Sequence, residues 1–230
     1  MFDPDTISSA ELAGIIDHTF LKAFGNAAPI EKLCAEAREY GFAMVAINPA
    51  EIERCVKLLE GTKVHAGAAI SFPLGQMTSA AKSFEIRDAL EKGAGEIDMV
   101  QNVRALQEGN FNLVFDEIAD MAAQCRAHGV ISKVILETCY LSDEEKVTTC
   151  ELAVKAGVDF VKTSTGFGTA GATAADIALM RKTVGPTMGV KAAGGIRDLQ
   201  ATFDMLRAGA TRIGTSASVK IVDELRALGR

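Results

Sequence analysis

Short apolar runs alternate with longer amphipathic segments along the whole chain. The intervening segments, such as residues 28–41 and 78–95, carry apolar residues at helical spacing with charges between them, and they close on glycines typical of helix ends. The pattern therefore predicts strands and helices in strict alternation. The predicted strands are residues 14–21, 43–48, 63–72, 96–102, 133–137, 159–163, 189–193 and 212–215.

Eight strands alternating with helices in 230 residues predict an α/β fold of the (β/α)8 barrel type, which is usually about 250 residues long. We expect residues 1–230 to form a single barrel domain. An open, doubly wound sheet is the alternative, but neither GxGxxG nor GxxxxGK[ST] follows the first predicted strand. In a barrel, catalytic side chains lie at the carboxyl ends of the strands.

Composition narrows the classes of partner. Hydrophobic residues make up 48% of the chain and charged residues 23%, and the formal net charge is −6 without any block of like charge. These values disfavour nucleic acid and an anionic membrane as partners, while a small anionic ligand needs only local donors. No apolar run approaches the roughly 20 residues of a membrane-spanning helix, and the N-terminus lacks the pattern of a secretory signal.

The cysteines and histidines lack metal-ligand spacing. Five cysteines are scattered without a CxxC pair, which is typical of a reduced, cytoplasmic protein. The three histidines, His18, His65 and His128, are far apart in unlike contexts. The sequence therefore gives no support for a metal-dependent mechanism.

Two lysines interrupt predicted strands. Lys162 lies in an apolar run, and Lys191 follows 29 positions later, which is the length of one strand-helix-strand step. In a barrel they lie on neighbouring strands at similar height, where desolvation and mutual repulsion both lower a lysine pKa. A neutral amine is a nucleophile for carbonyl groups. One strand lysine is more often a rim residue, but two on adjacent strands favour catalysis.

Two aspartates belong to the same predicted interior. Asp98 lies in the fourth strand, where it either forms a structural ion pair or serves as a general acid and base. Asp17 in the first strand has a similar setting but could simply bridge the barrel floor. His18 alternates to the opposite face of that strand, and we expect it to be packed rather than catalytic.

Glycines gather after the last three predicted strands. Gly166 follows strand six, Gly194 and Gly195 end strand seven, and strand eight runs into Gly214 and Ser216 before a helical tail. Each glycine alone is best explained by a tight turn. Together with a helix N-terminus they predict a phosphate site, and backbone N–H groups can bind phosphate in a protein of negative net charge.

A set of ordered motifs resembles the deoxyribose-phosphate aldolases, a family of class I aldolases on the (β/α)8 barrel. The motifs are IDHTFLKA, SFPLG, AAKSFE, EIDMVQNV, KVILETCYLSDEEKV, DFVKTSTGFGTAGAT and GVKAAGGIR, and the last two are the most specific. The resemblance covers residues 15 to about 218. It implies reversible cleavage of 2-deoxy-D-ribose 5-phosphate to D-glyceraldehyde 3-phosphate and acetaldehyde, without a cofactor, in a homodimer or larger homo-oligomer.

The resemblance also assigns roles that residue types and spacing leave open. It implies that Lys162 forms the Schiff base, that Lys191 lowers the pKa of Lys162, and that Asp98 relays protons. It further implies that Asp17 extends the proton network and that Thr165 contacts substrate, and we expect Asp17 as well as Thr165 to bind substrate. The phosphate is implied to bind at Gly166, Gly194, Gly195, Gly214 and Ser216.

Two departures from the family pattern bear on phosphate binding. Phe167 stands where some members carry lysine, and Ala217 stands where some carry a second serine. We therefore expect phosphate affinity to depend on backbone donors.

Two other functions fit parts of this pattern. One is a Schiff-base aldolase of the transaldolase or fructose-bisphosphate type, which would need a pocket for a longer donor than acetaldehyde. The other is a non-catalytic barrel that senses a sugar phosphate. The presence of Lys162, Lys191 and Asp98 together disfavours the sensor, because a binding protein has little use for two buried lysines.

Overall fold

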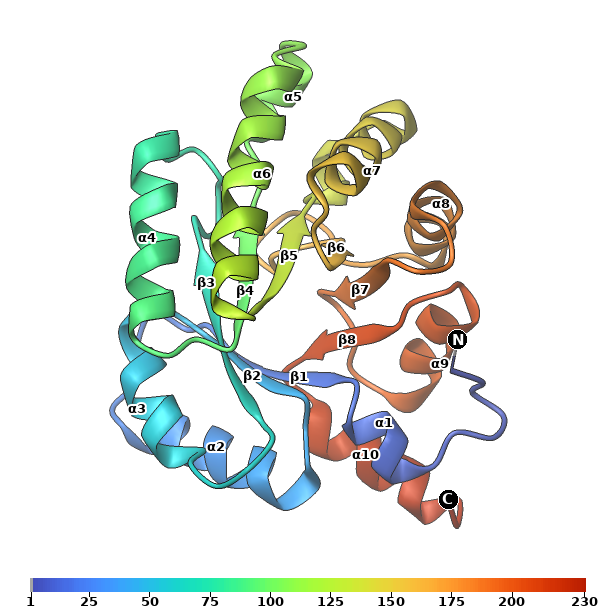
Figure 1. The fold of residues 1–230 in the computed structure, drawn as a ribbon. Coiled ribbons are helices and arrows are strands. Elements are labelled where there is room, and N and C mark those ends of the chain that lie inside the picture. Colours follow the sequence, from blue (N-terminus) through green and yellow to red (C-terminus); the bar gives the residue numbers. More distant parts are fainter. Residues whose placement is uncertain (1) are drawn as a thin grey trace.

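A closed barrel of parallel strands, encircled by helices, forms the protein in the computed structural model, which describes residues 2–230 (Figure 1). The strands are hydrogen-bonded in chain order, and the last pairs with the first. The predicted (β/α)8 barrel is confirmed, and the open sheet is wrong because neither end of the strand series is left unpaired. The strands are β1 (Ile16–Phe20), β2 (Met44–Ile47), β3 (His65–Ile70), β4 (Glu96–Val100), β5 (Ile131–Ile135), β6 (Phe160–Lys162), β7 (Gly189–Ala193) and β8 (Arg212–Thr215).

Helices occupy most of the connections. Helix α2 ends at Gly41 in the left-handed conformation (φ 72°), which matches the predicted glycine end. Helix α4 ends one turn earlier than predicted, with Lys92 as its C-cap and Gly93 (φ 93°) after it. The helices are α1 (Ser9–Ala13), α2 (Ala28–Tyr40), α3 (Ile52–Leu58), α4 (Ser79–Glu91), α5 (Val103–Gln107), α6 (Phe111–His128), α7 (Asp143–Ala156), α8 (Ala174–Val184), α9 (Leu199–Arg207) and α10 (Ser218–Ala227). Short 3-10 turns follow β2 (Pro49–Glu51) and β5 (Thr138–Tyr140).

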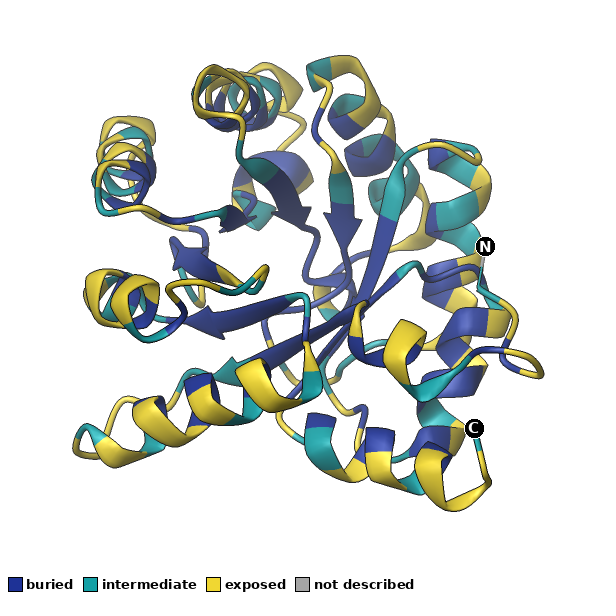
Figure 2. Ribbon diagram, turned by 60° about the horizontal axis from the view of Figure 1, so that its bottom comes forward, coloured by how far each residue is buried: buried dark blue, intermediate teal, exposed yellow. Residues whose placement is uncertain are grey.

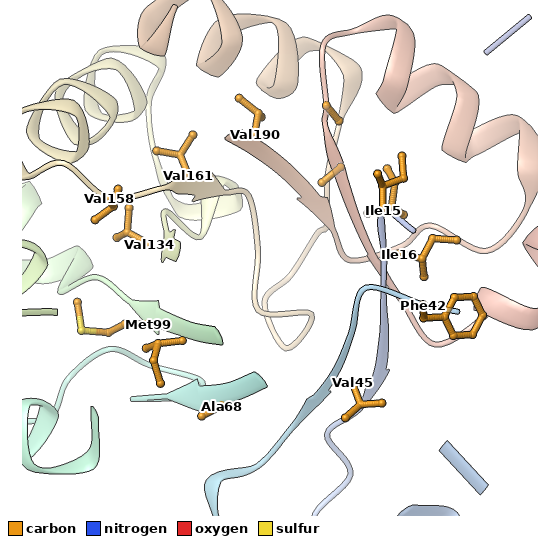
Figure 3. Close-up of a cluster of buried hydrophobic side chains, with 14 of the residues drawn as sticks. Ile15, Ile16, Phe42, Val45, Ala68, Met99, Val134, Val158, Val161 and Val190 are labelled. Carbon is orange, nitrogen blue, oxygen red and sulfur yellow. The ribbon is translucent and has the colours of Figure 1, made fainter. Parts of the chain in front are cut away.

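The apolar core is a layer between the strands and the helices. Every second strand residue points outward, so Val134, Val161 and Val190 on three successive strands face the helical layer (Figure 3). The helices turn their buried faces toward this layer and their exposed faces to solvent (Figure 2). None of the described helices combines the length and apolar character needed to cross a membrane.

The inward-facing positions carry the polar residues. Lys162 pairs in register with Lys191, and Asp98 pairs with Lys133, so these side chains lie at neighbouring levels inside the barrel. Small residues make room for large ones there. A Cβ atom on Gly189 would lie 2.1 Å from the Phe160 ring, so this position excludes any larger side chain. The barrel therefore encloses a polar interior within an apolar shell.

Candidate active site

The main cavity has a volume of about 650 Å³ and opens at the carboxyl ends of the strands. Asp98, Lys162 and Lys191 line its inner part. The rim comes from the loops that follow β1, β3, β6, β7 and β8. Its position is that of the active site in proteins of this fold.

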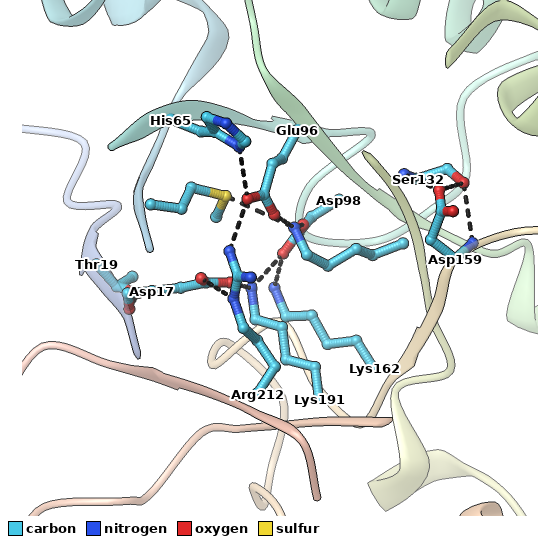
Figure 4. Close-up of polar contacts among 12 residues, drawn as sticks. Asp17, Thr19, His65, Glu96, Asp98, Ser132, Asp159, Lys162, Lys191 and Arg212 are labelled. Atoms are coloured by element: carbon cyan, nitrogen blue, oxygen red, sulfur yellow. Dashed lines mark hydrogen bonds and ion pairs between the residues drawn. The ribbon is translucent and has the colours of Figure 1, made fainter. Parts of the chain in front are cut away.

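Asp98 is the centre of the buried charges (Figure 4). Its Oδ2 atom accepts hydrogen bonds from Lys162 Nζ at 2.7 Å and from Lys191 Nζ at 2.6 Å. Its Oδ1 atom accepts one from Lys133 Nζ at 2.7 Å. Lys162 is 4% exposed, and both Lys133 and Lys191 are 0% exposed. One carboxylate thus holds three ammonium groups out of contact with bulk water.

A second layer of charges lies toward the amino ends of the strands. Arg212 donates from Nε to Asp17 Oδ1 at 2.5 Å and from Nη2 to Glu96 Oε1 at 2.6 Å. Lys191 also pairs with Asp17, and Lys133 also pairs with Glu96. The two layers together form what we call the charge cluster, which contains three carboxylates and four basic groups: Asp17, Glu96, Asp98, Lys133, Lys162, Lys191 and Arg212.

The geometry distinguishes Lys162 from the other two lysines. Lys191 and Lys133 each contact two carboxylates, whereas within the described residues Lys162 contacts one, Asp98. Its Nζ atom also lies 5.2 Å from the centre of the Phe72 ring, at the cavity wall. Lys162 is therefore the lysine of the cluster with the least compensation for its charge.

The pKa values follow from these contacts. Burial lowers the pKa of Lys162 to about 8; the Asp98 charge opposes this shift, and the Lys191 and Lys133 charges add to it. Burial would lower the pKa of Lys133 as well, but Asp98 and Glu96 outweigh burial and raise it. Burial disfavours the ionised form of Asp98, yet the three lysines hold its pKa well below the usual range. At pH 7 about one tenth of an amine with this pKa is neutral, compared with well under one thousandth at the ordinary value near 10.4.

Most of the remaining predicted residues also line the cavity. Gly166, Gly194, Gly195 and Ser216 lie on its rim, and the three glycines have positive φ angles of 95°, 86° and 80°. Gly214 lines it from within β8, where a Cβ atom would lie 3.0 Å from Lys191 Cε. Gly214 therefore has a packing reason that is independent of any phosphate.

Thr165 lines the cavity, but its hydroxyl is already engaged. Thr165 Oγ1 donates to Glu137 and accepts from Phe167 N at 3.0 Å. The Glu137 carboxylate also accepts from Thr165 N at 3.2 Å. Because a hydroxyl has one hydrogen, Thr165 can offer a bound molecule an acceptor site but no donor.

Asp17 is the exception among the predicted site residues. It is 0% exposed and lies outside the set of described residues that line the cavity. Its carboxylate forms ion pairs with Lys191 and Arg212. Its position corrects the expectation of direct substrate contact, because Asp17 can act on a bound molecule only through Lys191.

Sequence reasoning missed four charged residues of this region: Glu96, Lys133, Glu137 and Arg212. The predicted strand 133–137 begins at Lys133, whereas β5 begins two residues earlier and places Lys133 in its middle, facing inward. The alternation in ISKVI contained this signal, since Lys133 shares a face with Ile131 and Ile135. Glu137 has φ 58°, which the sequence does not indicate.

Comparisons with known proteins agree with the site. The family model described as DeoC/LacD family aldolase matches residues 12–221. The chain is 65% identical to deoxyribose-phosphate aldolase of Bacteroides thetaiotaomicron over 222 residues, which cover 96% of this chain and 93% of the relative. It is 54% identical to the enzyme of the same name from a Geobacillus species over 212 residues, or 92% of this chain and 95% of the relative.

A solved structure agrees with both the fold and the family. The tetrameric deoxyribose phosphate aldolase from Aeropyrum pernix superposes with a TM-score of 0.89 at 32% sequence identity, and the match covers 96% of this chain and 93% of that one. The family match extends over nearly all of the barrel, from α1 to α10. The chain therefore belongs to the DeoC/LacD family of aldolases.

Proposed function

We propose that this aldolase cleaves 2-deoxy-D-ribose 5-phosphate reversibly into D-glyceraldehyde 3-phosphate and acetaldehyde through a Schiff base on Lys162. The observation that carries the proposal is the Lys162 amine, which lies at the cavity wall with one carboxylate partner and a pKa lowered to about 8. The name shared by the relatives at 65% and 54% identity supports this substrate over that of a transaldolase or a fructose-bisphosphate aldolase.

The first step uses the neutral amine. Lys162 Nζ attacks the C1 aldehyde of the open-chain sugar, and loss of water gives a protonated imine. Asp98 is within hydrogen-bond distance of Lys162 and can take up and return the protons of this addition and dehydration. Asp98 Oδ2 is shared with Lys191, so a proton can also pass between the two lysines through one oxygen atom.

The second step breaks the C2–C3 bond. A base removes the C3 hydroxyl proton, the C3–O electrons form the new carbonyl of glyceraldehyde 3-phosphate, and the C2–C3 electrons move toward the imine nitrogen to give an enamine. We assign the base to Asp98 acting through a water molecule. Protonation of the enamine at C2 and hydrolysis of the resulting imine then release acetaldehyde and restore Lys162.

The phosphate end of the substrate fits the rim formed by Gly166, Gly194, Gly195 and Ser216. The positive φ angles of the three glycines and the nearby start of α10 bring backbone N–H groups to this edge of the cavity. Phe167 also lines the rim and offers no side-chain charge.

The proposal also covers the oligomeric state and the cellular location of the protein. We propose a homodimer or larger homo-oligomer, with support from the tetrameric relative of Aeropyrum pernix. We also propose a cytoplasmic location, in keeping with five free cysteines, of which Cys34, Cys55, Cys125 and Cys150 are buried.

Intact mass measurement after borohydride reduction tests the Schiff base directly. Incubation with 2-deoxyribose 5-phosphate followed by reduction is expected to give a covalent adduct, and peptide mapping is expected to place it on Lys162. An adduct on Lys191, or none at all, would overturn the assignment. Reduction without substrate is the control for non-specific modification.

The lowered pKa predicts a particular pH dependence. Because Lys162 must lose a proton before it attacks, kcat/KM is expected to rise tenfold per pH unit at low pH and to level off near pH 8. Initial rates between pH 6 and 10, with the reaction followed through glyceraldehyde 3-phosphate, measure this profile. A midpoint near the ordinary lysine value of roughly 10.4 would contradict the assignment of Lys162 as the desolvated nucleophile.

A further inference from the structure

We infer that His18 is a positioning residue for the phosphate end of the cavity and acts through Ser218 at the start of α10. The inference deepens the proposed function and rests on it. His18 lies on β1 next to Asp17, with its ring directed away from the charge cluster and toward α2 and α10. The mechanism proposed above makes no use of this buried imidazole.

Both ring nitrogens of His18 are engaged. Nδ1 lies 2.9 Å from Ser218 Oγ, and Nε2 lies 2.9 Å from Glu36 Oε2 on α2. The ring is 4% exposed, and it packs at a centroid distance of 5.0 Å against Phe42, just before β2. His18 and Glu36 nevertheless line the same cavity as Ser216. The imidazole thus connects α2 with the amino end of α10, beside the part of the rim that we propose to bind phosphate.

Hydrogen bonds connect Ser218 to the loop after β8, which forms part of the cavity rim. Ser218 Oγ lies 3.1 Å from the Thr215 carbonyl oxygen, and Thr215 Oγ1 accepts from Ala217 N at 2.9 Å. Thr215 Oγ1 also donates to the carbonyl oxygen of Ile196 at 2.7 Å, in the loop after β7. Ser216 lies between Thr215 and Ala217, the two residues that the hydrogen bond from Ala217 N to Thr215 Oγ1 joins. A displacement of Ser218 therefore moves the proposed phosphate donors of two loops.

The hydrogen count allows two arrangements. With neutral His18, Nε2–H donates to Glu36 and the Ser218 hydroxyl donates to Nδ1. With protonated His18, Nδ1–H donates to Ser218 Oγ, and the Ser218 hydroxyl turns to donate to the Thr215 carbonyl. The second arrangement fixes the whole chain of donors and places a positive charge beside the phosphate rim.

Phosphate binding is coupled to these arrangements. Burial lowers the pKa of His18, the hydrogen bond with Glu36 opposes this shift, and Lys32 on α2 acts in the same direction as burial. The other elements that pack on the ring present the uncharged Ser218 and Phe42. A phosphate dianion in the cavity favours the protonated form, and by linkage the protonated form binds the phosphate more tightly.

Two amide substitutions separate the contacts of His18. The amide of His18→Asn is placed to replace Nδ1 and keep the bond to Ser218, whereas that of His18→Gln is placed to replace Nε2 and keep the bond to Glu36. Steady-state kinetics are compared for 2-deoxyribose 5-phosphate and for unphosphorylated 2-deoxyribose. We expect His18→Gln and Ser218→Ala each to raise KM for the phosphorylated substrate about tenfold. We expect His18→Asn to stay within about threefold of the parent enzyme, and all three variants to keep their kcat/KM for 2-deoxyribose within about twofold.

A purely structural role would give another pattern. If His18 were purely structural, its replacement would impair the reaction of both substrates alike, and His18→Gln would retain more activity than His18→Asn because glutamine is bulkier. Either result would overturn the inference. His128→Asn is the matched control, because His128 is exposed on α6 and, within residues 2–230, bonds only to the Gln124 carbonyl of its own helix. If the Gln variant does not fold, Ser218→Ala decides the question by the same comparison.

A pH series adds a second readout. The KM advantage of the parent enzyme over His18→Asn for the phosphorylated substrate is expected to grow as the pH falls below the ordinary histidine value of about 6.5 and to vanish well above it, because only the parent can carry the imidazolium charge. The ratio cancels the titration of the substrate phosphate itself. A ratio that is constant with pH would overturn the coupling. Failure of the proposed function is distinguishable, since the parent would then cleave neither sugar, whereas failure of this inference leaves the parent active on both.

Discussion

Replacement of Lys162 by methionine is expected to lower kcat/KM for 2-deoxyribose 5-phosphate by about 10⁴-fold or more. Methionine keeps most of the side-chain volume and removes the amine that forms the imine. The fold is expected to survive, because Asp98 retains its bonds to Lys133 and Lys191. The substitution also removes the least compensated charge of the barrel interior, so loss of activity need not be accompanied by loss of stability.

Three measurements test this expectation together. Initial rates give the activity, borohydride trapping gives the covalent adduct, and urea unfolding gives the stability. Lys57→Met on the exposed face of α3 is the control for a lysine lost without consequence. Retention of more than about one hundredth of the activity by Lys162→Met, with an adduct elsewhere, would assign the nucleophile to another residue.

Replacement of Asp98 by asparagine is expected to lower both stability and activity. Three lysines lose their shared counterion, and removal of one partner of a buried ion pair typically costs about 3–5 kcal/mol. Loss of the proton relay is expected to lower kcat by about 10²–10⁴-fold. Loss of the Asp98 charge also removes the main influence that raises the Lys162 pKa, so the amine becomes neutral at lower pH.

The Asp98 variant therefore separates imine formation from turnover. Trapping of an adduct on Lys162 is expected to persist, and to extend to lower pH than in the parent, while multiple turnovers slow. Urea unfolding compared with Asp116→Asn, an exposed aspartate on α6, measures the stability cost. Turnover equal to that of the parent would remove Asp98 from the mechanism, and unchanged stability would show that the lysines find other compensation.

The register of Lys162 and Lys191 was accessible from the sequence because it depends on local regularity. Successive strand-helix-strand steps of similar length bring equivalent positions side by side, and the structure pairs the two residues directly. Asp98 was accessible for the same reason, since its inward direction follows from alternation along β4. Prediction succeeded where one strand and its neighbour contained the information.

The amino-end layer of the charge cluster was not accessible in this way. Arg212 contacts Glu96 from 116 positions away, across the barrel rather than along it. Alternation tells which side chains point inward but not which of them meet at the barrel axis. The later start predicted for the fifth strand compounded this, because it placed Lys133 at a strand end instead of in the middle of β5.

The composition of the charge cluster also affects the stability of the imine intermediate of the proposed reaction. When Lys162 is neutral, the charge cluster contains three cations and three carboxylates, so its net charge is zero. The protonated imine adds a fourth cation, whereas the cluster contains three carboxylates. Cleavage of the C2–C3 bond turns the imine into a neutral enamine and transfers the C3 hydroxyl proton to Asp98 through water. The extra positive charge therefore stays in the barrel as that proton, where it is available to protonate C2 of the enamine in the next step.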